Sequence, residues 1–378
     1  MPIPLPTPAD ELLTAPGADE VAMLARGMTS AIAPEGGLTS LQQVLMSAIV
    51  RAMTGFAVET RDLEPVGAAD FAEALAVRNL AFRTRIVQNM VLGELILEPL
   101  PPAVAARVRD FAAELCVDDE MISVAESYAA GALDVAAADF ARNGYLAAVD
   151  SDRLRAVHAD ALSQAWAAVT EDAALASQWG ALETLPVGTL GRGVADFYRD
   201  RGFVYPGLAG SAPPLLAQHD WVHVLAGYGT TLENELEVFA FIARANDDPR
   251  GFSLLAMIVS LFETGNLASG AGLFEANPGH LREAGMAVRL ADAMRRGALT
   301  SGSQDFLGID WFALADRQIH EVRREFALPD KSPEAVAAGS RGAWQDGGIT
   351  PYQLNSARQA AERAGRPYLP WTPDPARA

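Results

Sequence analysis

The chain has 378 residues, of which 50% are apolar and 20% are charged, and its formal net charge is −19. That length is enough for two or three domains with a sizeable core. The acidic excess argues against nucleic-acid binding, because proteins that bind the phosphate backbone carry a basic patch. It also argues against strong electrostatic docking on an anionic membrane. A single cysteine, Cys116, excludes an internal disulfide and an all-thiolate zinc site.

Residues 1–17 are rich in proline and small side chains, and we expect them to be disordered. They lack the basic region and the continuous apolar core of a signal peptide. The longest mostly apolar run, Phe252–Phe262, is too short to span a bilayer. We therefore expect a cytoplasmic protein without a transmembrane helix.

The hydrophobic period between the two ends of the chain is helical. Apolar side chains from Val104 to Leu115 recur at helical spacing behind Pro101-Pro102, which predicts a helix that begins at these prolines. Strand signals such as a sustained two-residue alternation or an Asn-Gly hairpin are scarce. The predicted fold class is therefore all-α. Cys116 continues the apolar stripe of this helix, so we expect a buried thiol rather than a nucleophile.

The chain divides into two predicted helical domains, residues 18–149 and 150–330, with flexible ends. Within the first, Ala33–Leu45 is a glycine turn followed by a helix, and it weakly resembles the opening of TerB-like tellurite-resistance domains. An unrelated bundle, or one like carboxymuconolactone decarboxylase, is the alternative. Residues 331–378 are expected to form a tail with one short helix, roughly Pro351–Ala364.

His219, Asp220 and His223 share one face of a predicted helix that starts at Pro213-Pro214. At 3.6 residues per turn, His223 lies about 40° from His219 around the helix, and Asp220 about 100° from it. Two imidazoles one turn apart can chelate a single divalent ion. The neighbouring side chains are apolar, so this helix is predicted to be buried, and buried imidazoles and carboxylates need partners.

A second predicted helix brings one carboxylate into an apolar stripe. Gly227-Tyr228-Gly229 ends the first helix, and Thr230 with Glu233 predicts a capping box for the next. Glu235 lies within the apolar stripe of that helix, whereas Glu233 and Glu237 are expected in solvent. An unpaired carboxylate there is costly, and a cation held by the neighbouring helix would remove the conflict. The alternative is that the histidines only pack or hydrogen-bond to backbone carbonyls.

These residues resemble a known family. His219-Asp220-Trp221-Val222-His223, followed after eleven residues by Glu235, matches the H-D-x-x-H…E signature of the coenzyme Q biosynthesis protein 4 family. Leu185–Gly191, followed by Phe197-Tyr198, resembles that family's LPxGTxG segment. Downstream, Ile309–Phe326 resembles its closing helix.

The resemblance covers roughly residues 150–330 and implies an all-α fold in which His219, Asp220, His223 and Glu235 bind a divalent ion, usually zinc. Nitrogen and oxygen ligands also suit manganese or iron. Asp220 could ligate directly, orient His219, or take part in catalysis. Family members act in ubiquinone synthesis on a prenylated aromatic ring and are linked to oxidative decarboxylation, in which hydroxyl replaces the ring carboxyl.

The resemblance also implies the expected partners. Family members bind isoprenoid lipids, gather other enzymes of the biosynthetic pathway and act at the periphery of membranes. We therefore expect a prenylated aromatic or isoprenoid lipid as ligand, complex partners from such a pathway, and contact with the inner face of the membrane. A homodimer is an open alternative, and no nucleic acid is expected.

The sequence departs from the family pattern in both predicted helices, the one that carries the histidines and the one that carries Glu235. Pro214–Gln218 replaces a run that contains arginine and tyrosine, Asn234 stands at a usual glycine, and Phe239 at a usual lysine. These differences affect the expected substrate more than the expected metal. Another prenylated or polyketide ring is therefore an alternative to the ubiquinone precursor.

Three functions remain open at this point. In an enzyme, the ion would keep an open position for water, oxygen or a phenolate. In a non-catalytic scaffold, the ion would be structural and an apolar cleft, lined by Phe252–Phe262, would hold a prenyl lipid. An HD-type phosphohydrolase also has a central pair like His219-Asp220, but it needs an earlier histidine and a later aspartate, for which the candidates are His158 and Asp247-Asp248.

Overall fold

The regular elements of the described chain are helices. The computed structural model describes residues 16–54, 56–97, 99–117, 122, 171–209, 211, 214–245, 255, 281, 283–300 and 304–374. Within these ranges the sheet-like backbone pairing is limited to one isolated antiparallel bridge between Thr189 and Gln318. The all-α prediction is therefore confirmed. Most of Phe252–Phe262 lies outside the described residues, as do His158 and Asp247-Asp248.

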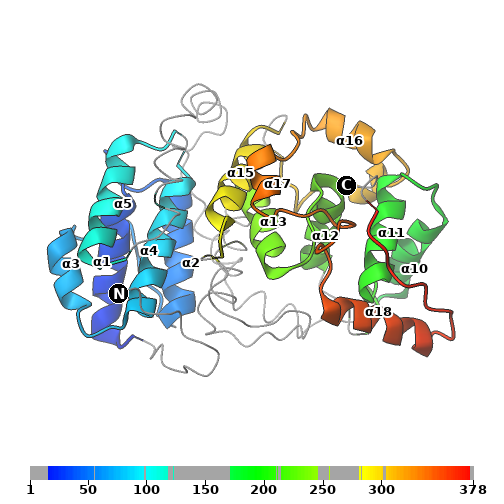
Figure 1. Cartoon of the computed structure of the whole chain (residues 1–378), viewed down its shortest axis with the longest axis horizontal. Helices are drawn as coiled ribbons and strands as arrows, with labels where there is room; N and C mark the ends of the chain where they lie inside the picture. The colour runs from blue at the N-terminus through cyan, green and yellow to red at the C-terminus, as the bar shows by residue number, and fades with distance from the viewer. Residues whose placement is uncertain are drawn as a thin grey trace.

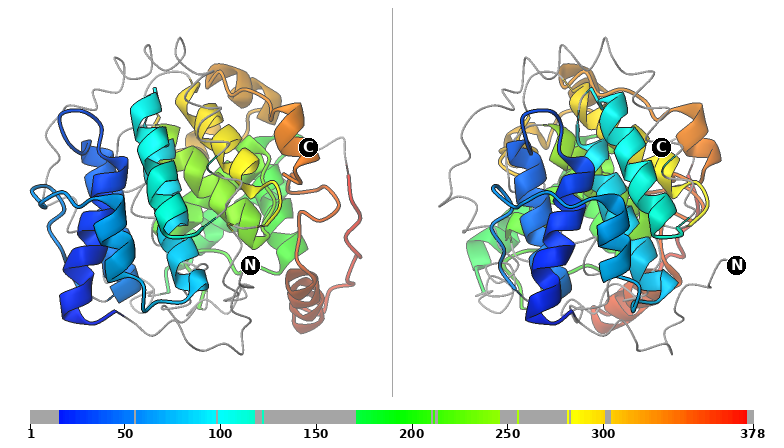
Figure 2. Two further views of the ribbon diagram at one scale, coloured as in Figure 1. Left: turned by 60° about the vertical axis from the view of Figure 1, so that its left-hand side comes forward. Right: turned by 90° about the vertical axis from the view of Figure 1, so that its left-hand side faces the viewer.

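The first five helices form one bundle, on the left of Figure 1, and their long axes are roughly aligned in Figure 2. They are α1 (Ala18–Ile32), α2 (Ser40–Thr54), α3 (Ala68–Ala74), α4 (Leu80–Leu95) and α5 (Pro102–Glu114). Helix α1 packs against each of the other four. Helix α5 starts at Pro102, as predicted, and buries Val104, Val108 and Phe111. The apolar spacing thus identified the face that packs in the core.

Cys116 is exposed, so the expectation of a buried thiol is wrong. Helix α5 ends at Glu114, and Cys116 adopts a left-handed backbone conformation with φ of 56°. The amide of Val117 then donates to the carbonyl of Ala112, which closes the helix end. The chain therefore leaves helical geometry just before the apolar stripe would have reached Cys116.

The remaining helices form a second group on the right of Figure 1. They are α10 (Ala173–Ala181), α11 (Leu190–Arg201), α12 (Pro214–Ala226), α13 (Leu232–Ala245), α15 (Met286–Ala298), α16 (Ile319–Glu325), α17 (Pro333–Ala337) and α18 (Pro351–Arg363), with 3-10 turns at Leu182–Thr184 and Trp311–Leu314. No helix in the described ranges is both long and apolar enough to span a lipid bilayer.

Helix α13 is the centre of this second group, since every residue from Asn234 to Ala245 is buried. Its closest neighbour is α15. Gly297 of α15 faces the backbone of α13 so closely that a Cβ atom there would lie 2.2 Å from the carbonyl oxygen of Phe241. The two helices therefore pack backbone against backbone at this point.

The start and the polar face of α13 differ from the prediction. The hydroxyl that accepts from the amide of Asn234 is that of Thr231, at 3.4 Å, and not that of Thr230. Glu237, expected in solvent, is 1% exposed. It accepts from Arg289 and from the side chain of Asn234, each at 2.7 Å. Because α15 covers the face that would otherwise be solvated, Glu237 needs this arginine.

The C-terminal segment packs onto the second group, which differs from the predicted tail. It contains α17 in addition to α18, the helix expected near Pro351–Ala364. Helix α17 packs on α15 and α18 packs on α11. The buried guanidinium of Arg201 donates to the carbonyls of Ala343 (2.9 Å) and Gly348 (3.2 Å). The segment is thus part of the core that carries the candidate site.

Candidate metal centre

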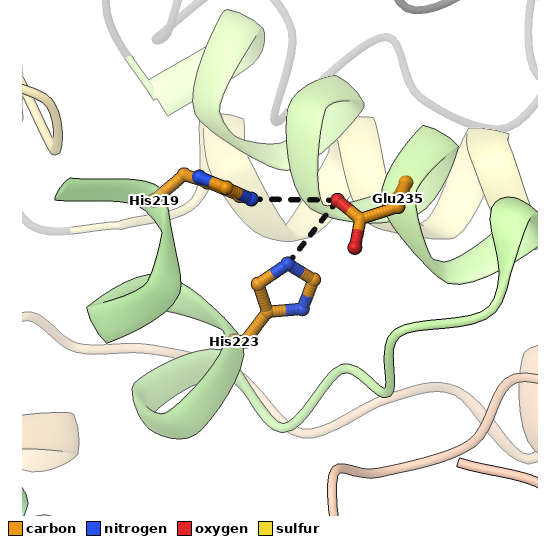
Figure 3. Close-up of side chains that lie close together, drawn as sticks. All are labelled: His219, His223 and Glu235. Atoms are coloured by element: carbon orange, nitrogen blue, oxygen red, sulfur yellow. Dashed lines mark ion pairs between the residues drawn. The ribbon is translucent and has the colours of Figure 1, made fainter. Parts of the chain in front are cut away.

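Two consecutive helices bring His219, His223 and Glu235 together. Helix α12 supplies the two imidazoles and α13 supplies the carboxylate (Figure 3). Oε2 of Glu235 lies 3.4 Å from Nε2 of His219 and 3.3 Å from Nε2 of His223. One ligand atom from each residue falls within 4.8 Å of the others, and all three residues are buried. This group could hold a metal ion.

The backbone after α12 orients His223. Gly227 ends the helix with φ of 75°, and the chain turns so that the carbonyl of Tyr228 lies 3.4 Å from Nδ1 of His223. A carbonyl can only accept, so Nδ1 is the donor in this contact and Nε2 is the ring nitrogen that faces Glu235.

Nε2 of His223 and the carboxylate of Glu235 need a positive charge between them, either a proton or a metal ion. This nitrogen is fully buried and has no hydrogen-bond partner. A lone pair that faces a carboxylate oxygen at 3.3 Å is repulsive unless a proton or a metal ion lies between them. The residues present therefore fit a divalent ion, which two imidazoles and a carboxylate would share.

Aromatic side chains fix the planes of both imidazoles. His219 stacks on Phe239 with ring centroids 4.9 Å apart, and His223 stacks on Phe197 at 5.5 Å. Phe239, at the position where the resembling family usually has lysine, therefore supports the ring of His219. The imidazoles are thus positioned before any ligand binds.

The Glu235 carboxylate is ionised in this setting. Burial alone would raise its pKa, but the imidazoles of His223 and His219 lower the pKa of Glu235 to about 2. The side chain is 2% exposed, so its charge depends on these neighbours rather than on water. Glu235 therefore presents a negative charge to both imidazoles across the physiological range of pH.

Asp220 borders this group without belonging to the compact set of three. Its Oδ1 lies 3.6 Å from Nε2 of His219, the same nitrogen that faces Glu235. Its Oδ2 accepts a short hydrogen bond of 2.5 Å from the hydroxyl of Tyr198 on α11. Burial raises the pKa of Asp220, an effect that His219, His223 and the Tyr198 hydrogen bond partly offset. Asp220 is thus the carboxyl group of this site that is best able to take up a proton.

Tyr198 and Arg201 complete the surroundings of the site, and the sequence alone assigned neither of them a role. Burial, followed by the charge of Asp220, raises the pKa of Tyr198 well above its usual value, so its hydroxyl stays protonated and donates. Arg201 stacks on Phe197, 3.8 Å from the ring centroid, on the ring that also supports His223. The sequence feature that pointed to Tyr198 was the Phe197-Tyr198 pair, which follows the segment Leu185–Gly191 that resembles the LPxGTxG segment of the family.

The segment Leu185–Gly191 holds α11 in place. The amide of Leu190 donates to the carbonyl of Arg317, and that of Gly191 to the carbonyl of Ala315, both at 2.8 Å. In return the amide of Ile319 donates to the carbonyl of Gly188. These bonds tie the start of α11 to the chain before α16, and α11 in turn carries Tyr198 to Asp220.

Replacing Tyr198 by phenylalanine is expected to destabilise the protein by about 1–3 kcal/mol, the usual cost of leaving a buried polar group without its partner. The Asp220 carboxyl group would lose its donor, and its raised pKa would rise further. Denaturant unfolding measures the loss. Tyr352→Phe is the matched control, because Tyr352 is 50% exposed and should change stability by less than about 0.5 kcal/mol. Equal stability of both variants would contradict the role of the Tyr198 hydroxyl.

No family model, curated protein or solved structure matches this chain. Its functional assignment therefore starts from the geometry of the site and from the resemblance of its motifs described above.

Proposed function

We propose that the chain is a metal-dependent enzyme in which His219, His223 and Glu235 bind one divalent ion. The observation that supports this most is the convergence of three buried ligand atoms within 4.8 Å. Two histidines and one carboxylate form the ligand set of many catalytic zinc sites and of non-haem iron oxygenases. Zinc, iron or manganese would suit the site, and three protein ligands leave room for a further ligand.

The substrate class follows from the resemblance to the coenzyme Q biosynthesis protein 4 family. We propose a prenylated hydroxybenzoate-type ring as substrate, with replacement of its carboxyl group by hydroxyl as the reaction. The step balances with dioxygen as the two-electron oxidant, because the ring carboxylic acid, dioxygen and water together give the ring hydroxyl, carbon dioxide and hydrogen peroxide. When bound, the ion supplies a Lewis acid that favours the deprotonated phenol. Asp220 then serves as proton acceptor, and Tyr198 holds its carboxyl group in place. The stacked rings of Phe197 and Phe239 keep both imidazoles in their ligating orientation.

The test combines elemental analysis with turnover. The full chain is purified without added metal and analysed, then stripped by a chelator and reloaded separately with zinc, manganese and ferrous iron. Each form is incubated in air with a prenylated 4-hydroxybenzoate, and mass spectrometry follows loss of carbon dioxide and gain of hydroxyl. We expect one ion per chain and turnover only in a loaded form.

Each other outcome has a distinct meaning. Folded wild-type protein that binds no ion, even after reloading, would overturn the metal site. A loaded protein that retains the prenylated compound without converting it would instead identify a lipid-binding scaffold. Release of phosphate from nucleotides would support the HD-type phosphohydrolase.

A further inference from the structure

A pocket lies at the C-terminal end of α12. It has a volume of about 210 Å³. Its walls include Gly227, Arg296 of α15, Arg323 of α16 and the chain from Leu328 to Lys331. Since about 10–15 Å³ of such space is enough for one water molecule, the pocket has room for several. That space suits a small functional group rather than a long lipid chain.

The charges around this pocket are predominantly positive. Arg296, Arg323 and Lys331 line it, against a single lining carboxylate, Asp330. Two further carboxylates nearby already have arginine partners. Glu237 pairs with Arg289, and Asp292 pairs with Arg295, each at 2.7 Å. A concentration of cations is unexpected in a chain whose net charge is −19.

A structural role accounts for only part of this charge. Arg296 donates to the carbonyls of Ala226 and Pro329, each at 2.9 Å, and Arg323 donates to the carbonyl of Leu225 at 2.6 Å. Both arginines thus cap the C-terminal end of α12, where cations are favourable. The capping contacts leave Nη1 of Arg296 buried without a hydrogen-bond partner.

Lys331 has no such structural role. Its Nζ is buried and has no hydrogen-bond partner. It lies 4.5 Å from the ring centroid of Tyr228, whose π face attracts a cation but accepts no ordinary hydrogen bond. A buried ammonium group without an acceptor is costly, so the charged form of Lys331 needs a partner.

The cost of burying this charge also appears in the pKa of Lys331. Burial lowers it to about 7, with Arg296 and Arg289 acting in the same direction and Glu237 and Asp292 opposing. Asp330 and Tyr228 are the other titratable groups beside it. An anion in the pocket would favour the charged form and raise this pKa again.

We propose that the pocket binds the oxyanion group of a small molecule, a carboxylate or a phosphate, between Lys331, Arg296 and Arg323. The inference is independent of the proposed metal chemistry, because none of the three candidate metal ligands lines the pocket. One residue contacts both places. The carbonyl of Tyr228 faces His223, and its ring lies against Lys331 and Arg296.

The composition of the chain makes a direct test possible. Lys331 is its only lysine, so protein made with lysine labelled by carbon-13 at Cε gives one lysine side-chain signal. This signal is followed while inorganic phosphate or, separately, acetate is added, with chloride at equal ionic strength as the reference. We expect a saturable shift with at least one of the two anions and a rise of the lysine pKa from about 7. The anion that acts identifies the class of ligand.

Two matched variants establish where the anion binds. Arg323→Gln should weaken binding by about tenfold or more, the usual contribution of a charge-assisted hydrogen bond. Arg324→Gln, at the next residue, is the control, because Arg324 is exposed and does not line the pocket. In a second measurement, the anion should raise the melting temperature of the wild type but not that of Lys331→Met.

A lysine signal that responds to neither anion beyond the effect of chloride would overturn the proposal. Equal weakening in the Arg324→Gln control would also overturn it, since binding would then reflect only general surface charge. If Arg323→Gln fails to fold, the wild-type titration and the comparison of melting temperatures still decide the question.

Discussion

Replacing Glu235 by glutamine is expected to abolish stoichiometric metal binding while α12 and α13 remain packed. Glutamine preserves the size of the side chain but removes the anionic ligand that faces both imidazoles at 3.3–3.4 Å. Partners outside the ligand shell contribute about 10–100-fold to metal affinity, so a loss of more than about 100-fold is expected when a ligand itself is removed.

Competition with a coloured chelator measures this affinity directly, and circular dichroism checks that the helices persist. Glu233→Gln is the matched control, since Glu233 lies on the same helix but outside the group of ligands. The control should bind the ion as the wild type does. A Glu235→Gln protein that still binds one ion with unchanged affinity would remove this residue from the site.

Gly297→Ala is expected to destabilise the protein by at least about 2 kcal/mol, at the upper end of the usual cost of overpacking. The added methyl group would lie 2.2 Å from the carbonyl oxygen of Phe241 and 3.1 Å from the amide nitrogen of Ala245. Both are backbone atoms, so relief requires α13 and α15 to separate. The gain in helix propensity, about 1 kcal/mol, offsets only part of this cost.

Denaturant unfolding measures the effect, with Gly180→Ala as the control. Gly180 also lies in a helix, α10, but nothing stands within 4 Å of a Cβ atom added there. The control should be neutral or more stable by up to about 1 kcal/mol. Similar stabilities for the two variants would show that α13 and α15 can separate at this point without a large loss of stability. Because α13 carries Glu235, the Gly297→Ala protein should also bind metal more weakly.

The sequence could predict those features that depend on local helix geometry. Pro102 and Pro214 start helices where expected. The spacing of His219 and His223 placed both rings on one face. Glu235 stood out because a carboxylate in an apolar stripe conflicts with burial. Each of these inferences needs only the period of one helix and the cost of burying charge.

Contacts between distant segments lay beyond the reach of local patterns. The hydrogen bond from Tyr198 to Asp220 depends on how α11 packs on α12. Glu237 was expected in solvent because its own helix gives no sign that α15 covers that face. Likewise, Lys331 was regarded as part of a flexible tail, although the fold buries its ammonium group against Tyr228. These interactions cannot be predicted from the order of residues along a single helix.

The contacts of Arg201 have a consequence for the order in which the protein is made. Ribosomes release a chain from its N-terminal end, and earlier parts begin to fold first. The carbonyls of Ala343 and Gly348 emerge more than a hundred residues after Arg201, yet they are the acceptors for its guanidinium, which lies in the core beside the candidate metal centre. A nascent chain therefore cannot complete the surroundings of the candidate centre until the segment with Ala343 and Gly348 has emerged.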